Sequence, residues 1–363
     1  MQTQTNKNGK SIVMTGGGTA GHVTPNIALI PHLKAEGFTD IHYIGTDGIE
    51  KELIEKIDGV TYHVIPSGKL RRYFSLKNFT DPFRVISGIF KAKKIIRNIR
   101  PDVVFSKGGF VSVPVVIGAK GVSPVVAHES DYTPGLTTKI SSHYAKKICV
   151  SFEDTMQYLP SKKAVHTGSP IRDMLFEGNG DRAKAAMGFS GSKPVLMVMG
   201  GSLGALAVNN AVREALPVIL ERFNVVHICG KGKVDSAYSH IDGYVQYEYV
   251  SEELPDIFNA ADIIISRSGA NSVFEFLALC KPSVLIPLPS ASSRGDQLLN
   301  AEYFRKRGYS EVILQEDITP EKLTQTVFDM YDEREKYIST MSNEKTARDG
   351  TKNVIRVILE TSK

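Results

Sequence analysis

Short apolar runs alternate with segments of helical periodicity along the whole chain. The runs lack a regular polar alternation, which is typical of strands buried on both faces of a sheet. Because helical segments separate the runs, the pattern predicts parallel α/β sheets with about six strands in each half of the chain. The predicted strands are residues 11–15, 41–45, 61–65, 102–106, 124–127, 147–151, 195–199, 225–229, 245–249, 262–266, 283–287 and 311–314.

Two of these strands lead directly into a glycine-rich turn that opens a helix. One turn covers residues 16–21 and the other covers residues 200–204. Such a turn brings free backbone N–H groups and the positive end of a helix dipole to one point, which favours phosphate binding. Two turns of this kind predict two facing Rossmann-like domains with a phosphorylated ligand in the cleft between them.

The length of 363 residues also favours two domains. A polar interval at residues 160–170 is the predicted crossing between them. The first domain is therefore predicted to cover residues 1–167 and the second to cover residues 168–342. The C-terminal helix, residues 343–363, is expected to pack back on the first domain.

The spacing of Gly16, Gly18 and Gly21 formally matches the dinucleotide-binding fingerprint. A dinucleotide site also needs an acidic residue near the end of the second strand, and Asp47 lies too far along and is interpreted as a turn residue. The turn therefore predicts phosphate binding without indicating NAD. His22 follows at a helix N-terminus, where the dipole favours a neutral imidazole that accepts a proton or binds a substrate; the alternative is a histidine that only caps the turn.

A third glycine turn, residues 106–112, contains Gly108 and Gly109 and follows another predicted strand. Together with the first turn it predicts a cradle of two loops for a diphosphate. Glu129 and Asp131 come at the end of the next strand, on the edge of the sheet where ligands bind. Their carboxylates could bind sugar hydroxyls or accept a proton, and the alternative role is helix capping.

In the second half, residues 268–270 form a turn that opens a helix aimed at an anion. Glu275 lies about a turn and a half into this helix, where its carboxylate could accept hydrogen bonds from a ribose diol while the helix N-terminus holds the adjoining phosphate. Further side chains that suit a nucleotide-sugar pocket are Arg172, Ser202, Asp296 and Gln297.

The sequence contains no Asp-x-Asp pair and no His/Cys cluster with metal-ligand spacing, so no metal and no other cofactor is expected. A diphosphate leaving group must then be stabilised by helix dipoles, backbone N–H groups and Arg172. Cys149, Cys229 and Cys280 stand singly in apolar stretches and are interpreted as core residues.

The positive charge of the chain is concentrated between residues 66 and 100, where ten basic residues stand against one acidic residue among many apolar ones. A basic face beside exposed aromatic side chains suits an anionic bilayer, at about 1 kcal/mol per basic residue near the surface. The alternatives are a basic helix packed on the core and, less favoured because no recognised motif is present, a nucleic-acid site. The expected membrane patch comprises Leu70, Arg71, Arg72, Tyr73, Phe74, Phe79 and Phe83.

The first ten residues are polar, and the chain has no apolar stretch of 18 residues or more. Neither a signal peptide nor a membrane span is therefore expected. The chain is therefore expected to remain in the cytosol, and if the basic patch binds a bilayer, the protein would be attached peripherally to the cytoplasmic face of the cell membrane.

In their order and spacing, these motifs resemble the MurG family of bacterial peptidoglycan glycosyltransferases, family 28, which have the GT-B fold of two facing Rossmann-like domains. The resemblance implies an inverting, metal-independent transfer of N-acetylglucosamine from UDP-N-acetylglucosamine. The acceptor would be the muramyl 4-hydroxyl of lipid I, the undecaprenyl-diphosphate-linked muramyl pentapeptide, and the product lipid II. The motifs that carry the resemblance are residues 16–22, 108–112, 128–129, 200–202, 267–275 and 296–301.

The family also implies roles for single residues. The glycine turns at Gly17, Gly18, Gly108 and Gly109 would receive the acceptor diphosphate. His22 would be the base, with Glu129 or Asp131 in reserve. The residues implied to contact the UDP-sugar are Thr19, Ala20, Gly21, Arg172, Ser202, Val250, Ala270, Asn271, Ser272, Glu275, Asp296 and Gln297.

The chain departs from the family pattern at three places. Ala20 replaces a glycine and requires a backbone conformation that tolerates a Cβ atom. Ser130 and Asp131 replace the usual Gln-Asn pair, and Asp296 replaces Gln or His. Three other functions stay open: a UDP-N-acetylglucosamine 2-epimerase, which shares the fold; another GT-B lipid glycosyltransferase; and a catalytically silent protein that binds UDP-sugar or lipid and scaffolds other cell-wall synthesis proteins.

Overall fold

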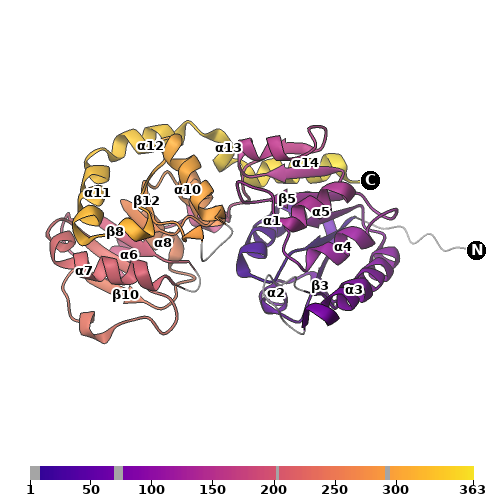
Figure 1. Ribbon diagram of the computed structural model, residues 1–363, viewed down its shortest axis with the longest axis horizontal. Coiled ribbons are helices and arrows are strands. Elements are labelled where there is room, and N and C mark those ends of the chain that lie inside the picture. Colours follow the sequence, from indigo (N-terminus) through magenta and orange to yellow (C-terminus); the bar gives the residue numbers. More distant parts are fainter. Residues whose placement is uncertain (1–8, 69–76, 202–203, 291–294) are drawn as a thin grey trace, which may run out of the picture. The chain divides into compact units, whose positions relative to one another are not determined.

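The computed structural model describes residues 9–68, 77–201, 204–290 and 295–363 of the chain. The chain forms two compact units (Figure 1). Unit 1 comprises the residues up to Arg172 together with Asp349–Lys363, and unit 2 comprises Asp173–Arg348. The crossings at 172/173 and 348/349 lie a few residues beyond the predicted domain boundaries.

Unit 1 is built around a seven-stranded sheet in the order β3-β2-β1-β4-β5-β6-β7, in which every neighbouring pair is parallel. Such a sheet needs a crossover between successive strands, and helices or loops supply it. The strands are β1 (Lys10–Thr15), β2 (Phe38–Gly45), β3 (Val60–Val64), β4 (Val103–Ser106), β5 (Val125–Glu129), β6 (Lys147–Val150) and β7 (Ala164–His166). The main helices are α1 (Thr24–Ala35), α2 (Ile49–Ile54), α3 (Lys77–Ile99), α4 (Ser112–Gly118), α5 (Leu136–Tyr144) and α14 (Gly350–Thr361), and short 3₁₀ helices are η1 (Ala20–His22) and η2 (Glu153–Tyr158).

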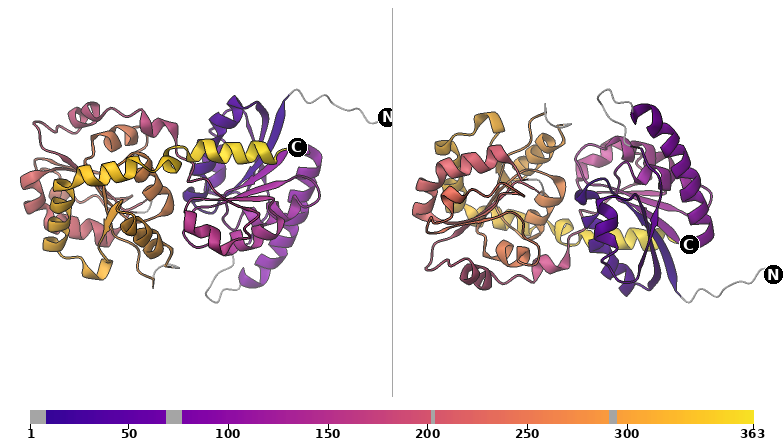
Figure 2. Two further views of the ribbon diagram at one scale, coloured as in Figure 1. Left: turned by 90° about the horizontal axis from the view of Figure 1, so that it is seen from above. Right: turned by 90° about the horizontal axis from the view of Figure 1, so that it is seen from below.

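Alternate residues of each strand feed two hydrophobic cores on opposite faces of this sheet. On one face, Ile12 and Met14 of β1 join buried residues of α1 and α14. On the other face, Val13 joins buried residues of α3 and α4. Figure 2 shows the C-terminal helix α14 lying along the sheet of unit 1, although it comes last in the sequence.

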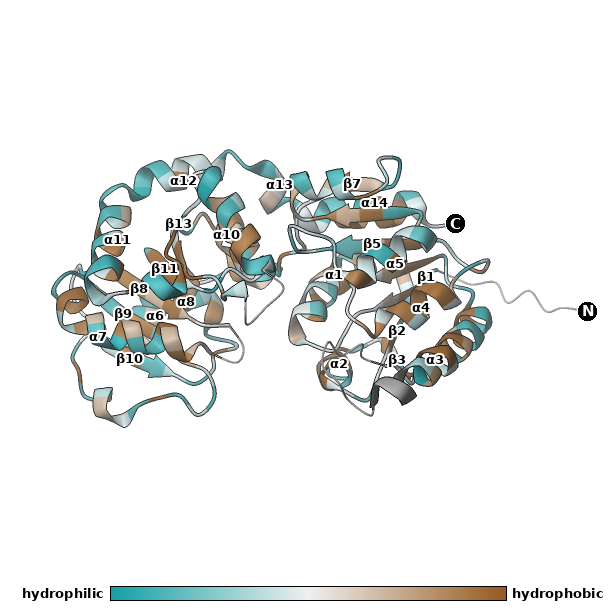
Figure 3. Cartoon of the chain, viewed as in Figure 1, coloured by the Kyte–Doolittle hydropathy of each residue, from teal (hydrophilic) through white to brown (hydrophobic). Residues whose placement is uncertain are grey.

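Unit 2 has a six-stranded sheet in the order β10-β9-β8-β11-β12-β13, again parallel throughout. Its strands are β8 (Val195–Met199), β9 (Asn224–Ile228), β10 (Tyr244–Tyr247), β11 (Ile263–Ser266), β12 (Ser283–Leu285) and β13 (Ser310–Val312). Its helices are α6 (Gly180–Ala186), α7 (Leu206–Arg222), α8 (Leu254–Ala260), α9 (Ala270–Ala278), α10 (Asp296–Lys306), α11 (Pro320–Asp332), α12 (Arg334–Ser342) and α13 (Lys345–Arg348), with 3₁₀ helices η3 (Asp173–Phe176), η4 (Ser236–Tyr238) and η6 (Gln315–Asp317). In Figure 3 most strands of both units are largely hydrophobic, as expected for strands covered on both faces, whereas β10 at the edge of the second sheet is mainly hydrophilic.

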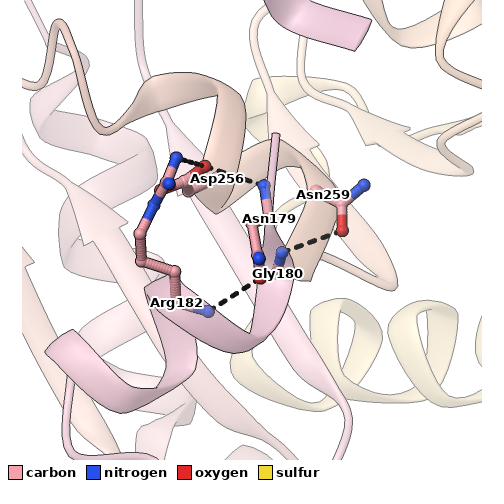
Figure 4. A network of polar contacts seen from close by, with 5 residues as sticks. All are labelled: Asn179, Gly180, Arg182, Asp256 and Asn259. Atoms are coloured by element: carbon pink, nitrogen blue, oxygen red, sulfur yellow. Dashed lines mark hydrogen bonds and ion pairs between the residues drawn. The ribbon is translucent and has the colours of Figure 1, made fainter. Parts of the chain in front are cut away.

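A polar network fastens the first helix of unit 2 to α8 (Figure 4). The Asp256 carboxylate accepts hydrogen bonds from the Asn179 backbone N–H, at 2.7 Å, and from the Arg182 guanidinium. Asn259 accepts from the Gly180 N–H at 2.9 Å. These bonds satisfy N–H groups at the start of α6 that have no partner within the helix.

The prediction of two parallel α/β sheets is confirmed, and each of the twelve predicted strands is present within a few residues of its expected bounds. The sequence analysis missed β7, which has three residues and falls in the interval interpreted as the interdomain crossing. Among the helices that the structure describes, none is long and apolar enough to span a bilayer.

Candidate functional site

Each sheet reverses its strand order at one place, and the glycine turns lie there. In unit 1 the reversal falls between β1 and β4, which are followed by residues 16–18 and 108–109. In unit 2 it falls between β8 and β11, which are followed by residues 200–201 and 268–269. Ligands of doubly wound sheets bind at the carboxyl ends of the strands on either side of such a reversal.

The two turns of unit 1 are in direct contact. The Lys107 backbone N–H donates to the Thr15 carbonyl at 2.9 Å, which extends the pairing of β1 and β4. Gly109 has a φ of +78°, and a Cβ atom there would lie 2.2 Å from the Gly17 carbonyl oxygen and 2.5 Å from Cδ2 of His22. A side chain does not fit at this position. Three residues of the predicted site, Gly17, Gly109 and His22, are therefore close together.

The residues after the first turn form the short helix η1, which leads into α1. The backbone N–H of His22 donates to the Thr19 carbonyl at 3.1 Å, and the side chain is half-buried. Gly18 and Thr19 are exposed, while Ala20 and Gly21 are half-buried. Within the described residues, positive φ angles outside glycine occur at Arg100 and Cys280, so the backbone of Ala20 tolerates its Cβ atom.

A buried carboxylate that the sequence analysis missed binds the first turn through hydrogen bonds. Glu50, at the start of α2, has no exposed surface. Its carboxylate accepts hydrogen bonds from the N–H of Gly18 at 3.2 Å and from the N–H of Thr46 at 3.0 Å. A Cβ atom at Gly17 would lie 2.6 Å from the Glu50 carboxyl carbon. One N–H group of the predicted phosphate turn is thus occupied by the protein itself.

Glu129 uses its carboxylate to organise the loop after β5. Its oxygens accept from the N–H groups of Ser130, Asp131 and Gly135 at 2.9, 3.1 and 3.0 Å. Burial and the charge of Asp131 raise the pKa of Glu129, while hydrogen bonds from the Thr138 side chain and from the backbone of Gly135 and Asp131 oppose the rise. The geometry favours the capping role over that of a base. Asp131 itself is half-buried and follows directly.

Lys107 is a second buried charge that the sequence analysis missed. It follows β4, precedes the turn at Gly108 and Gly109, and is 3% exposed. Its ammonium donates to Nδ1 of His128 at 2.8 Å and to the hydroxyl of Ser130. Burial lowers the pKa of Lys107 to about 8.

In unit 2, hydrogen bonds tie the turn before α9 to the first turn of α10. The Ser268 hydroxyl donates to the Gln297 carbonyl at 2.8 Å, and the Asn300 side chain donates to the Ser268 carbonyl at 3.1 Å. The Gln297 side-chain oxygen accepts from the Leu288 N–H at 3.0 Å. Buried Arg267 donates to the carbonyl groups of Ile286 and Pro287. The starts of two helices are therefore held together at the carboxyl edge of the sheet.

The remaining residues that are predicted to contact the UDP-sugar lie in both units. Asn271, Ser272 and Glu275 are half-buried on α9, at whose start Ala270 lies buried, and Asp296 begins α10 after Gly295 with a φ of +81°. Val250 is buried in unit 2, and Arg172 is half-buried at the end of the first segment of unit 1. Ser202 lies outside the described residues.

The predicted membrane patch is described only in part. Residues 70–74 and the side chain of Phe79 lie outside the described part of the chain. On α3, Phe83, Ile86 and Phe90 are 75%, 51% and 70% exposed. Exposed basic side chains accompany them on the same helix, whose mixed hydropathy is visible in Figure 3: Arg84, Lys91, Lys94 and Arg97. Within the described residues, no group of three or more His, Cys, Asp or Glu side chains could hold a metal ion.

Comparison with known families matches both units. The model of the glycosyltransferase family 28 N-terminal domain matches residues 12–150, and that of the C-terminal domain matches residues 195–354. The UDP-N-acetylglucosamine–N-acetylmuramyl-(pentapeptide) pyrophosphoryl-undecaprenol N-acetylglucosamine transferase of Clostridium tetani is 53% identical over 351 residues, covering 96% of this chain and 97% of that protein. The protein of the same name from Lachnoclostridium phytofermentans is 55% identical over 353 residues, covering 97% and 99%.

Solved structures agree in fold. The crystal structure of Acinetobacter baumannii MurG is 27% identical, has a TM-score of 0.74 and covers 97% of this chain and 99% of its own. A UDP-GlcNAc 2-epimerase from Neisseria meningitidis has a TM-score of 0.66 at 13% identity over 97% of this chain and 100% of its own. The second likeness concerns the fold alone.

Proposed function

This chain belongs to glycosyltransferase family 28, and on that premise we propose that it transfers N-acetylglucosamine from UDP-N-acetylglucosamine to lipid I, giving lipid II in peptidoglycan synthesis. The observation that carries the proposal is the near-complete match to curated transferases at 53% and 55% identity. In this proposal the glycine turns at the reversal point of each sheet would supply backbone N–H groups for the phosphates of the substrates.

The decisive experiment is a transfer assay with labelled UDP-N-acetylglucosamine and a lipid I analogue. We expect label to move to the lipid. Label appearing as UDP-N-acetylmannosamine, or as free N-acetylmannosamine with UDP released by hydrolysis, would instead indicate the epimerase, and binding without turnover would indicate the scaffold.

The acceptor would bind in unit 1, with its diphosphate at the turns of Gly17, Gly18, Gly108 and Gly109. His22 is the proposed base that takes the proton of the muramyl 4-hydroxyl as it attacks the anomeric carbon and UDP departs. Its contact with Gly109 places the imidazole beside both turns. Asp131 remains the reserve base, whereas the three N–H bonds of Glu129 support its role as a loop anchor.

The test for His22 is His22→Ala, which should reduce kcat by about 10²–10⁴-fold, the range typical of a lost general base. Affinity for UDP-N-acetylglucosamine, measured by calorimetry, serves as the control for folding. Near-normal turnover would remove His22 from the mechanism and direct attention to Asp131.

The donor would be held by the N-termini of α9 and α10 in unit 2. Glu275 is proposed to accept hydrogen bonds from the ribose diol, and the start of α9 at Ala270 to hold the adjoining phosphate. The bonds among Ser268, Gln297 and Asn300 support this role because they fix the two helix starts relative to one another. Glu275→Ala should weaken UDP binding, and unchanged affinity would refute the ribose assignment.

The reaction is proposed to proceed without a metal ion, and helix N-termini and backbone N–H groups would stabilise the departing diphosphate. Activity that EDTA abolishes and magnesium restores would contradict this.

The exposed apolar and basic residues of α3 support attachment to an anionic membrane surface, where the lipid acceptor resides. Attachment at the cytoplasmic face and association with other cell-wall synthesis proteins remain part of the proposal.

A further inference from the structure

Lys107 lies where the two glycine turns of unit 1 leave the sheet. Its backbone N–H bonds the Thr15 carbonyl, and a Cβ atom at Gly16 would lie 3.2 Å from the Lys107 Cβ atom. The next two residues are Gly108 and Gly109, with φ angles of +92° and +78°. The lysine stem therefore runs beside the place where both turns leave the sheet, and its head group lies inside unit 1 with 3% of the residue exposed.

The ammonium group of Lys107 carries the positive charge of this cluster without help from its neighbour His128. Nε2 of His128 lies 3.1 Å from the Gly168 carbonyl, to which it donates, so Nδ1 is the nitrogen that accepts from Lys107. Burial and the charge of Lys107 hold the pKa of His128 well below its usual range. The histidine is therefore neutral, and it orients the ammonium.

Two carboxylates, Glu129 and Asp131, act on Lys107 from the end of β5 and the loop that follows. Their charges favour the ammonium form of Lys107 and oppose the effect of burial. The thiol of Cys149 on β6 also faces it, but burial raises the pKa of that thiol to about 12, so it is uncharged. The cluster thus places one ammonium group beside two carboxyl groups. If Lys107 lost its charge, no cation of the cluster would offset these two carboxyl groups, and an anion at the turns would be less favoured; the backbone N–H bonds to Glu129 would remain.

We propose that Lys107 is a positioning residue for the acceptor, whose ammonium offsets Glu129 and Asp131 so that the edge formed by β1, β4 and β5 can receive a diphosphate. The inference rests on the proposed function, which places the acceptor diphosphate at these turns. It also accounts for two departures from the family pattern: the short Ser130 side chain reaches the ammonium, and Lys107 balances the carboxylate of Asp131.

The charge of Lys107 depends on pH in a range where the enzyme can be assayed. Because burial lowers its pKa to about 8, the ammonium is present at pH 7 and largely lost at pH 9. Acceptor binding needs the charged form, so the KM for a lipid I analogue should rise between these pH values. A bound diphosphate stabilises the ammonium and moves its pKa upward.

The experiment measures kcat and the KM of both substrates at pH 7 and pH 9 for the wild type, Lys107→Met, Asp131→Asn and the double variant. Lys107→Met should raise the acceptor KM at pH 7 roughly tenfold, equivalent to about 1.4 kcal/mol, and should remove its pH dependence. The double variant should recover most of this loss because the unbalanced carboxylate is gone. The donor KM should change little.

A matched control is Lys281→Met, which removes a partly buried lysine of unit 2 that donates to the carbonyl groups of Asn259 and Ala261. It should leave the acceptor KM and its pH dependence unchanged. Multiplicative effects of the two single substitutions in the double variant would overturn the proposal. A wild-type acceptor KM that is constant from pH 7 to pH 9 would also overturn the proposal. This measurement uses the wild type alone and does not depend on the folding of any variant. Absence of transfer by the wild type at pH 7 would instead refute the proposed function.

Discussion

Gly109→Ala should destabilise unit 1 far more than an alanine at a comparable glycine elsewhere in the unit. A positive φ costs alanine about 1–2 kcal/mol. At Gly109 the new Cβ atom would also overlap the Gly17 carbonyl oxygen at 2.2 Å and the His22 ring at 2.5 Å. Forcing atoms into such a packed site costs a further 1–3 kcal/mol, roughly, so the expected loss in free energy of unfolding is about 3 kcal/mol.

The matched control is Gly121→Ala. Gly121 has a φ of +75°, close to that of Gly109, but no atom lies within 4 Å of the position of its Cβ. Its expected cost is therefore the backbone term, about 1 kcal/mol. Urea unfolding of both variants, followed by the fluorescence of the tyrosines, measures the difference in the same unit.

The same pair of variants tests the geometry of the site. Gly109→Ala can relieve the overlap by separating the two turns and displacing His22, so turnover should fall while Gly121→Ala stays near the wild type. Equal losses of stability in the two variants, or a fully active Gly109→Ala, would refute the claim that the turns and His22 are in contact.

Three further predictions concern other parts of the chain. Asp256→Asn should make the stability of unit 2 less sensitive to acid. Arg182 lowers the pKa of the Asp256 carboxyl, so this ion pair stabilises the fold at neutral pH, and its contribution is lost as the pH falls below about 4. Urea unfolding at pH 7 and at pH 3.5 measures the change. Glu50→Gln should cost about 1–3 kcal/mol, because the NH₂ group of the buried amide would face the N–H of Gly18 or of Thr46, from which the carboxylate now accepts hydrogen bonds; an unchanged urea midpoint would contradict this. Phe83→Ser with Phe90→Ser should reduce co-sedimentation with anionic liposomes at unchanged solution stability, and equal binding would remove this face of α3 from the membrane surface.

The fold could be predicted from the sequence because the inner strands, such as β4, β9 and β11, are buried on both faces. Such strands appear as apolar runs, and each of the twelve predicted strands is present, including the more polar and partly exposed β3 and β10. The sequence did not predict β7, because a strand of three residues at the end of a sheet needs little apolar surface and the residues that flank it in the sequence are polar. Its partner β6 supplies the pairing, which local sequence does not reveal.

The backbone part of the site could also be predicted, whereas the buried charges could not. Glycine turns after β1 and β4 must be neighbours once the strands are parallel and adjacent, so the closeness of Gly17, Gly109 and His22 follows from the sheet order. Glu50 lies in a short polar stretch that is typical of a solvent-exposed helix, and the Gly18 N–H that it binds lies 32 residues away in the sequence. Lys107 likewise reads as an ordinary loop lysine, since only its packing against β5 shows that it is buried.

The two units place a cation at the same position of their sheets. Lys107 follows β4 and Arg267 follows β11, each directly before a turn at the reversal point, and both are buried. Arg267 binds backbone carbonyl groups and Gln315, and a guanidinium stays protonated at every pH in which Lys107 titrates. Lys107 instead binds a neutral imidazole and a hydroxyl, and an ammonium changes its pKa readily when buried. The charge behind the proposed acceptor turns can therefore be lost near pH 8 while the charge behind the proposed donor turn persists, which is why pH should separate the two Michaelis constants of one enzyme.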